Sequence, residues 1–299
     1  MYGNNTLMKI YDSVSDALAE CFGADVQILE RRRVSGGDIN DAWCLYMSDG
    51  SRLFLKSNSR RNASFFRTEW NGIQALRDTG TARVPALYAA GTDGDSSFLL
   101  MEWIESGRRS RDYMENLGRS LAQMHLAKTP GGGRYGFAED NYIGATVQHN
   151  TWCASWIEFF REQRLEPQIQ MASGWFDGEL RRKFSYLLDH LDDRLTEPDR
   201  PSVLHGDLWG GNVMAGPDGE AVLIDPAVYV GHAEADLAMT QLFGGFTHDF
   251  YKAYNEVKPI DGGYNDRRDL YNLYHMLNHL NLFGGGYLGE VVRILGRYV

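Results

Sequence analysis

The sequence predicts an α+β protein of two lobes, a small N-terminal lobe with an antiparallel sheet plus a helix and a larger, mostly helical C-terminal lobe. Two observations support this expectation. Short β-forming runs separated by turn residues dominate the first 103 residues. Long segments with apolar residues at helical spacing follow Gly107. We therefore expect one lobe over residues 1–103 and the other over residues 104–299.

The small lobe should begin with an amphipathic helix over residues 6–22, because the apolar residues there recur on one helical face. Strands follow, and Ser48-Asp49-Gly50 has the composition of a hairpin turn. A helix with an aromatic and aliphatic stripe precedes the last strand of the sheet. The expected strands are 26–33, 42–47, 52–56 and 98–104, with the helix over 64–79.

The C-terminal lobe should consist of helices with one stretch of short strands and loops among them, residues 203–226. This stretch contains a short strand, a loop, a glycine-rich turn at 216–219 and a second strand at 221–224. A loop beside short strands can hold reactive groups in place while substrate reaches them. The expected helices are 113–125, 151–169, 176–195, 232–242, 248–254 and 266–282.

Composition argues against several classes of function. A formal charge of −10 over 299 residues disfavours sequence-independent binding to nucleic acid or to an anionic membrane, since both need a positive face. Three cysteines are too few and too scattered for a disulfide framework or a zinc site. No apolar run approaches the roughly 20 residues of a membrane span. We expect a cytoplasmic protein with reduced thiols that binds neither nucleic acid nor membrane.

The chemistry is concentrated in His205-Gly206-Asp207-Leu208-Trp209-Gly210-Gly211-Asn212, followed by Leu223-Ile224-Asp225-Pro226. Asp207 can take the proton of an acceptor hydroxyl, while Asn212 and Asp225 offer oxygen atoms to the Mg²⁺ ions that bridge nucleotide phosphates. These two residues follow Asp207 by five and eighteen positions, which matches the protein-kinase pattern. Gly206 and Pro226-Ala227 stand where that pattern has Arg and Phe-Gly, so the sequence points away from protein kinases proper.

Lys56 closes an apolar strand, from which its ammonium could reach the α- and β-phosphates of ATP. Glu69, thirteen residues later on the next helix, is its expected partner, because such an ion pair fixes the orientation of the lysine. Either residue alone would be read as an ordinary surface charge. The catalytic stretch favours the ion pair.

Two further segments are candidates for the nucleotide site. The loop 35–40 precedes the strand of Lys56 by one strand, and backbone amides at Gly36 and Gly37 could cover phosphates there. An ordinary hairpin turn is the alternative. Met101-Glu102-Trp103-Ile104 ends the small lobe, so the carbonyl of Glu102 and the amide of Ile104 could pair with adenine, although the segment alone reads as a buried strand.

His205 and Asp236 are expected to have structural roles. A histidine that opens a catalytic loop, and an aspartate at the start of a helix, more often brace backbone by hydrogen bonds than take part in chemistry.

The longer strings 208–212, 225–232, 234–246 and 271–284 resemble those of the fructosamine kinase (ketosamine-3-kinase) family, within the aminoglycoside phosphotransferase and choline kinase-like group. The resemblance covers nearly the whole chain. It implies a protein-kinase-like fold and phosphorylation by Mg·ATP of a sugar hydroxyl, typically at carbon 3, of a ketosamine. The phosphorylated adduct then sheds its sugar, which is a deglycation or protein-repair role. By this resemblance Asp207 is the base, Asn212 and Asp225 hold magnesium, and Lys56 holds phosphate.

The resemblance also bears on oligomeric state. Some members carry a cysteine in the phosphate loop that can link two chains, whereas residues 35–40 contain none. We therefore expect a monomer or a non-covalent dimer.

The sugar pocket is less defined by the sequence. Trp209, beside the base, could stack on a sugar face, and the helical lobe supplies further hydrogen-bonding groups. Three of these groups share one helix face at i, i+3 and i+4, so a satisfied buried polar cluster is an equal alternative. The candidates besides Trp209 are Asn141, His232, His275, Asn278 and His279.

Other functions remain open from the sequence. A small-molecule kinase acting on an aminoglycoside, choline or another amine alcohol would share the same kinase residues. A nucleotide-binding pseudokinase is disfavoured because Lys56, Asp207, Asn212 and Asp225 are all present. The acceptor could be a free ketosamine or a glycated protein lysine, and its sugar could derive from ribulose or fructose.

Overall fold

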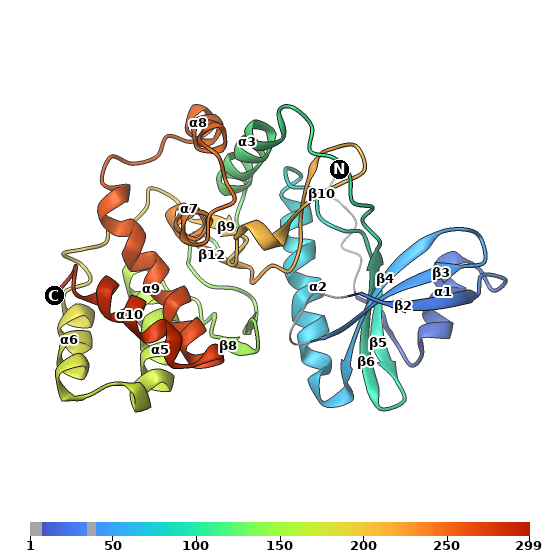
Figure 1. Ribbon diagram of the computed structural model, residues 1–299, viewed down its shortest axis with the longest axis horizontal. Coiled ribbons are helices and arrows are strands. Elements are labelled where there is room, and N and C mark those ends of the chain that lie inside the picture. The colour runs from blue at the N-terminus through green and yellow to red at the C-terminus, as the bar shows by residue number, and fades with distance from the viewer. Residues whose placement is uncertain (1–7, 35–39) are drawn as a thin grey trace.

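A six-stranded sheet and a helical lobe lie side by side along the long axis of the molecule (Figure 1). The structure is a computed structural model and describes residues 8–34 and 40–299. Strand order in the sheet is β1-β5-β6-β4-β3-β2, and its neighbours are antiparallel apart from β1 and β5. The elements of the small lobe are β1 (Ile10–Tyr11), α1 (Val14–Phe22), β2 (Ile28–Arg33), β3 (Asp41–Met47), β4 (Arg52–Ser59), α2 (Ala63–Asp78), β5 (Leu87–Asp93) and β6 (Ser96–Glu102).

The first helix is shorter than the sequence predicts. Within the described residues it begins at Val14, because Ser13 is extended and its side chain accepts a hydrogen bond from the amide of Asp16. The two residues of β1 instead pair with β5, where Gly91 leaves room for the carbonyl of Tyr11. The prediction of helix before Ser13 was therefore wrong for these residues. Strand β5 was not predicted, since Ala89-Ala90-Gly91 has low β-propensity.

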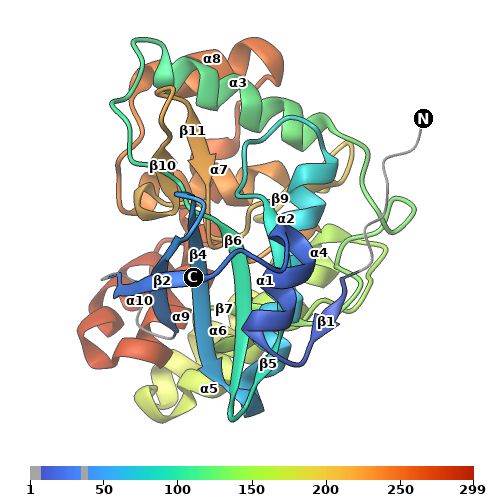
Figure 2. The same ribbon diagram turned by 90° about the vertical axis from the view of Figure 1, so that its right-hand side faces the viewer.

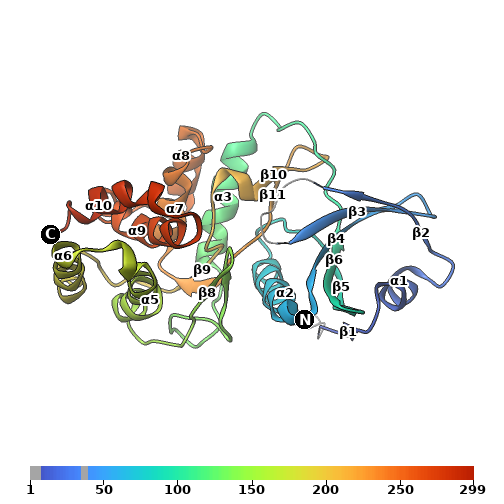
Figure 3. The same ribbon diagram turned by 60° about the horizontal axis from the view of Figure 1, so that its bottom comes forward.

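The sheet carries one helix on each face. Helix α2 lies between the sheet and the large lobe, whereas α1 covers the opposite face, which is turned toward the viewer in Figure 2 (Figures 2 and 3). Strand β6 alternates accordingly: Phe98 and Leu100 join the α1 core, while Leu99 and Met101 join the core shared with α2. Both faces of this strand are apolar, so it reads as a continuous hydrophobic run.

The large lobe is mainly helical and contains three two-stranded ribbons, β7–β8, β9–β12 and β10–β11. Its elements are α3 (Tyr113–Leu126), β7 (Asn141–Ile143), β8 (Thr146–Gln148), α4 (Trp156–Phe159), α5 (Glu166–Met171), α6 (Gly178–Asp189), β9 (Ser202–Leu204), β10 (Val213–Ala215), β11 (Ala221–Leu223), β12 (Tyr229–Gly231), α7 (Ala233–Leu242), α8 (His248–Val257), α9 (Tyr264–Phe283) and α10 (Leu288–Leu295). The α+β class and the two-lobed arrangement are confirmed. Among the described residues, no helix is both long and apolar enough to cross a membrane.

The expected helix over 151–169 is interrupted in the structure. Cys153 forms a bridge with Tyr135, Ser155 caps α4, and a π-helical turn at Phe160–Leu165 separates α4 from α5. Helix α6 also ends at Asp189, earlier than predicted. Hairpin β7–β8 and helix α10 were not predicted.

The two lobes share one hydrophobic core. At their junction, Gly72 of α2 packs against Val228, and a β-carbon at residue 72 would lie 3.3 Å from that side chain. The amide of Leu223 donates to the carbonyl of Arg83 at 2.8 Å, which ties β11 to the loop between α2 and β5. The residues of the catalytic stretch lie beside this junction.

Candidate active site

Ribbon pairing brings the predicted catalytic residues together. Strand β9 ends at Leu204, and the loop after it passes Asp207 and reaches a 3₁₀ turn at Gly210–Asn212. Hairpin β10–β11 then returns the chain to Asp225. The side-chain amide of Asn212 donates to the backbone carbonyl of Asp225 at 3.5 Å, so the two expected metal ligands are neighbours.

An ion pair joins the lobes at this point. Nζ of Lys56 lies 2.6 Å from Oε1 of Glu69 and 2.5 Å from Oδ1 of Asp225. The predicted pairing of Lys56 with Glu69 is confirmed. Burial alone would lower the pKa of Lys56, but the two carboxylates outweigh it and raise that pKa, so the side chain remains an ammonium.

Two carboxyl groups, those of Glu69 and Asp225, share the one ammonium of Lys56. Burial alone would raise the pKa of Asp225, but the charge of Lys56 lowers it, so the carboxylate stays ionised. About half of the side-chain surface of Asp225 is nevertheless open to solvent. A carboxylate and a neighbouring amide oxygen, from Asp225 and Asn212, form an oxygen donor set of the kind that Mg²⁺ takes together with nucleotide phosphates. The residues present therefore fit this metal.

Asp207 is positioned by Asn212 and has the electrostatics of a base. Nδ2 of Asn212 donates to the backbone carbonyl of Asp207 at 2.8 Å and to its Oδ2 at 3.1 Å. Burial raises the pKa of Asp207 to about 7; the hydrogen bond from Asn212 opposes this rise and the charge of Asp225 adds to it. A carboxylate with such a pKa can accept a proton from a hydroxyl near neutral pH.

His205 and Asp236 brace the catalytic loop, as predicted. Asp236 accepts hydrogen bonds from the amides of His205 at 2.7 Å and Gly206 at 2.9 Å. Its Oδ2 also lies 3.2 Å from Nε2 of His125 on α3. The imidazole of His205 has Nε2 3.0 Å from the carbonyl of Ile224, and burial lowers its pKa, so it is a neutral ring that joins the loop to the residue before Asp225.

The departure from the protein-kinase pattern at Gly206 has a steric cause. Its φ is +83°, and a β-carbon there would lie 1.9 Å from the carbonyl oxygen of Ala227. The amide of Ala227 meanwhile donates to the carbonyl of His205 at 2.9 Å. Only glycine fits where the two backbones approach this closely.

Two buried side-chain amides, Asn141 and Gln148 on hairpin β7–β8, hold the segment after Asp225; we call them the amide clamp. Nδ2 of Asn141 donates to the carbonyl of Val228 at 2.7 Å, and Nε2 of Gln148 donates to that of Ala227 at 3.0 Å. Among the described residues, Asp225 is the only non-glycine residue with a positive φ, +52°. The amide clamp therefore supports a segment whose first residue has an uncommon backbone conformation.

The large-lobe core holds the amide clamp in turn. Asn150 donates to Oδ1 of Asn141 at 2.9 Å, and the hydroxyl of Tyr274 donates to Oε1 of Gln148 at 2.8 Å. Oδ1 of Asn150 accepts from the fully buried guanidinium of Arg164 at 2.8 Å. The sequence signal for this network was the dense run of polar residues at 139–141 and 148–150. Sequence reasoning did not identify Gln148, Asn150, Arg164 or Tyr274.

Three of the six sugar-pocket candidates are buried and use polar atoms within the protein. Asn141 belongs to the amide clamp. His232 caps helix α7, since its Nδ1 accepts from the amide of Glu234 at 3.1 Å. Asn278 accepts from Nε2 of Gln168 at 3.3 Å. These three side chains occupy positions in the scaffold, and Asn278 is the one among them for which the sequence also offered a buried polar cluster.

The other three candidates are Trp209, His275 and His279. His275 is buried; its Nδ1 lacks a hydrogen-bond partner among the described residues, and burial lowers its pKa to about 3, so the ring is neutral. His279 is half-buried and its Nδ1 donates to the carbonyl of His275 at 2.8 Å. Trp209 is exposed, two residues after Asp207.

The segment from Met101 to Ile104 connects the lobes, as expected of a hinge. The carboxylate of Glu102 accepts from the amide of Ala86 at 2.9 Å and pairs with Arg83, so its side chain is engaged within the small lobe. No residue in the described part of the chain accepts a hydrogen bond from the amide of Ile104. Gly36 and Gly37, the expected phosphate cover, lie outside the described residues.

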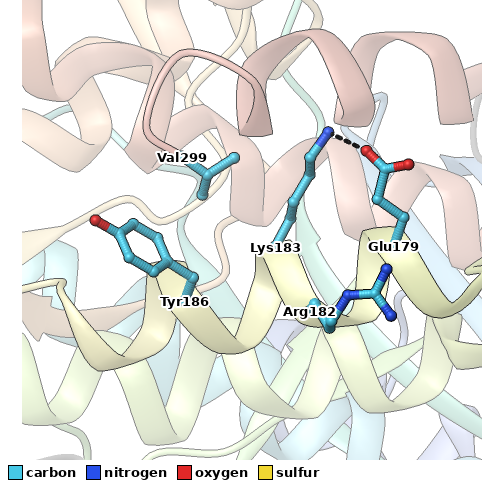
Figure 4. Close-up of a pocket in the computed structure, with 5 residues that line it drawn as sticks. All are labelled: Glu179, Arg182, Lys183, Tyr186 and Val299. Carbon is cyan, nitrogen blue, oxygen red and sulfur yellow. Dashed lines mark ion pairs between the residues drawn. The ribbon is translucent and has the colours of Figure 1, made fainter.

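A surface pocket of about 430 Å³ lies on α6, at the end of the large lobe away from the sheet (Figures 1 and 4). It is lined by Glu179, Arg182, Lys183, Tyr186 and Val299. Lys183 and Glu179 form an ion pair at 2.8 Å within it. None of the predicted site residues lines this pocket, so it has no part in the argument for catalysis.

Comparison with known proteins also finds similarity to kinases. Residues 10–299 match the family model described as fructosamine kinase. A probable ketoamine kinase of Synechocystis is 41% identical over 95% of each chain, and a chloroplastic protein-ribulosamine 3-kinase of Oryza sativa is 43% identical over 89% of this chain and 78% of its own. A crystal structure from Haemophilus somnus, named for fructosamine-3-kinase, has a TM-score of 0.87 at 30% identity and covers 97% and 98% of the two chains.

Proposed function

The chain belongs to the fructosamine kinase family, and we propose that it phosphorylates a sugar hydroxyl of ketosamines, at O3, with ATP as the phosphoryl donor. The observation that supports this most directly is the group formed by Lys56, Glu69 and Asp225 beside Asp207. It combines a phosphate-binding ammonium, a metal-binding carboxylate and a base. The family relationship points to a ketosamine as the acceptor.

In the proposed nucleotide site, adenine lies along Met101–Ile104 and pairs with the carbonyl of Glu102 and the amide of Ile104. Lys56 binds phosphate oxygens, while Asn212 and Asp225 hold Mg²⁺. When bound, the metal neutralises the charge of the phosphates. The phosphate-covering role of Gly36 and Gly37 rests on sequence alone.

In the proposed transfer, Asp207 accepts the proton of the sugar hydroxyl as the hydroxyl oxygen bonds to the γ-phosphorus. The bond from that phosphorus to the bridging oxygen breaks in line, and ADP leaves. Asn212 keeps the carboxylate of Asp207 in place, and Asp236 keeps the loop in place. Positioning and electrostatics are therefore the main contributions of the protein.

The proposed role is deglycation, because a ketosamine phosphorylated at O3 is unstable and releases its sugar. We also propose a reducing, cytoplasmic location. Cys21, Cys44 and Cys153 are free thiols, two of them buried, which fits a compartment where disulfides are rare.

The test is ADP release with ribulosyl-lysine and fructosyl-lysine, measured beside choline and an aminoglycoside as acceptors. We expect turnover with one or both ketosamines, and NMR of the product should show phosphorus on O3. Turnover of choline or the aminoglycoside alone would replace the proposal with another small-molecule kinase. Absence of ADP release with every acceptor would refute the kinase proposal itself.

A further inference from the structure

A run of aromatic rings, exposed or half-buried, begins beside the proposed catalytic base and continues across the ends of α7 and α9. We call Trp209, Phe243, His279, Phe283 and Tyr287 the aromatic strip. Ring centres are 6.2 Å apart from Trp209 to Phe243, 5.1 Å from Phe243 to His279, and 5.5 Å from His279 to Phe283. Trp209, Phe243 and Phe283 are 40%, 46% and 56% exposed. Contiguous exposed rings of this kind usually mark a binding surface.

The aromatic strip is fixed relative to the base. The indole of Trp209 lies over Gly211, where a β-carbon would be 2.3 Å from the ring. Phe243 directly follows α7, the helix whose Asp236 braces the catalytic loop. Helices α7 and α9 pack against one another, so the rings of His279 and Phe283 on α9 are also held in place relative to the catalytic loop (Figure 1).

The far end of the aromatic strip continues to one more exposed ring. A β-carbon at Gly285 would lie 2.9 Å from the ring of Trp175, which is itself exposed. Tyr287, two residues later, contacts His279 with ring centres 5.2 Å apart. The rings thus form a path that leads outward from the catalytic loop.

The segments that form the strip contain no formal charge. The chain has 30 Lys and Arg and 40 Asp and Glu, yet none falls within 208–217, 237–248 or 270–289. A site for a phosphate, a carboxylate or an acidic peptide would need cationic side chains there. The uncharged, aromatic composition of these segments instead suits a ligand with an apolar chain, whose positive charge can lie on the faces of the rings.

On the basis of the proposed function, we infer that the aromatic strip binds the amine-derived part of the ketosamine, an alkyl stem such as the four methylenes of a lysine side chain. The amine nitrogen is attached to C1 of the sugar, only two carbons from C3, so its substituent must leave the site close to Asp207. The stem is apolar, and the protonated amine at its start is a cation. Aromatic rings can contact both the apolar stem and the cationic amine. The aromatic strip begins where the substituent leaves the catalytic site.

The experiment uses three adducts of the same sugar, made with methylamine, butylamine and a lysine within a short peptide. The KM of the unaltered protein should fall about two- to fourfold for each methylene that the strip covers. Phe243→Ala and Phe283→Ala should each raise KM for the butylamine and peptide adducts about tenfold, with kcat and the methylamine adduct unchanged. Tyr186→Ala, which removes an equally exposed ring on α6, should change none of these values (Figure 4).

Other outcomes would overturn the inference. Equal KM values across the three adducts would show that the strip does not touch the stem. An equal rise in KM for all three adducts in the Phe variants would show the same. A dimer that dissociates in Phe243→Ala and Phe283→Ala, measured by sedimentation, would make the strip a contact between copies of the chain. Turnover of the methylamine adduct tests the proposed function separately, because that adduct lacks the alkyl stem that the strip is inferred to bind.

Discussion

Nε2 of Gln148 donates a 3.0 Å hydrogen bond to the backbone carbonyl of Ala227, two residues after Asp225. This bond connects hairpin β7–β8 to the segment that follows Asp225, the proposed metal ligand. It is buried, and the hydroxyl of Tyr274 fixes the other end of the same amide. We therefore expect Gln148 to be a positioning residue that acts on Asp225 through the backbone.

Gln148→Leu should lower the free energy of unfolding by about 1–3 kcal/mol, because the carbonyl of Ala227 and the hydroxyl of Tyr274 would lose a buried partner. It should also raise KM for Mg·ATP more than KM for the ketosamine. Urea unfolding and two-substrate kinetics measure these effects. Gln170→Leu, on the exposed side of α5, is the matched control and should leave both unchanged. A stability loss without a change in KM for Mg·ATP would limit Gln148 to a structural role.

Asp207→Asn should bind Mg·ATP nearly as well as the unaltered protein while losing about 10²- to 10⁴-fold in kcat, because the amide cannot accept the hydroxyl proton. Calorimetric titration gives the first value and ADP release the second. Turnover equal to that of the unaltered protein would exclude Asp207 as the base.

Asp225→Ala should weaken Mg·ATP binding about 10- to 100-fold, because it removes a proposed metal ligand and the cross-lobe partner of Lys56. Isothermal titration with and without Mg²⁺ measures this loss. Asp218→Ala, in the exposed turn of hairpin β10–β11, is the control and should bind normally. Unchanged affinity in Asp225→Ala would contradict its role.

Gly206→Ala should lower the free energy of unfolding by about 2 kcal/mol or more and abolish turnover, because the added β-carbon meets the carbonyl of Ala227 and φ is positive. Thermal unfolding followed by circular dichroism provides the measurement. Gly262→Ala, where nothing lies within 4 Å of the new atom, is the control. Equal melting temperatures of the two variants would refute the steric account.

Stability should decrease as pH falls from about 6.5 toward 3, in part because of His232. Burial, with the positive charges of Arg267 and Lys258, lowers the pKa of His232 from 6.5 to about 3. The unfolded chain therefore binds a proton in this window that the folded protein does not. This lowers the free energy of unfolding by up to about 1.4 kcal/mol for each pH unit that the pH falls. His232→Asn keeps a capping side chain and should show a shallower slope of unfolding free energy between pH 6.5 and 5. An unchanged slope would exclude this contribution.

The sequence was most informative where residues are close in the chain. The spacing of Asp207, Asn212 and Asp225 predicted that these three residues lie together, and they do, because a loop and a hairpin carry all three. The pairing of Lys56 with Glu69 also followed from a strand and the next helix. Helical periodicity indicated the large lobe in the same way, although it could not foresee that Ser155 and a π-helical turn divide residues 151–169.

The features that were missed depend on contacts between distant segments. Asn141 and Val228 are 87 positions apart, so no local pattern shows that this amide supports the segment after Asp225 instead of binding a sugar. Likewise, nothing in the sequence around Ile10 shows that these residues pair with β5. In both cases, contacts between segments far apart in the sequence determine the structure.

Asp236 has a consequence for how the protein becomes active during folding. Its carboxylate meets the amides of His205 and Gly206 and the imidazole of His125, and His125 in turn lies 2.8 Å from the hydroxyl of Tyr254 on α8. The shape of the catalytic loop therefore depends on contacts from α3, α7 and α8, although His125 and Asp236 are 111 positions apart. We accordingly expect catalysis to recover late on refolding, with the assembly of the large lobe, and helix content to return earlier.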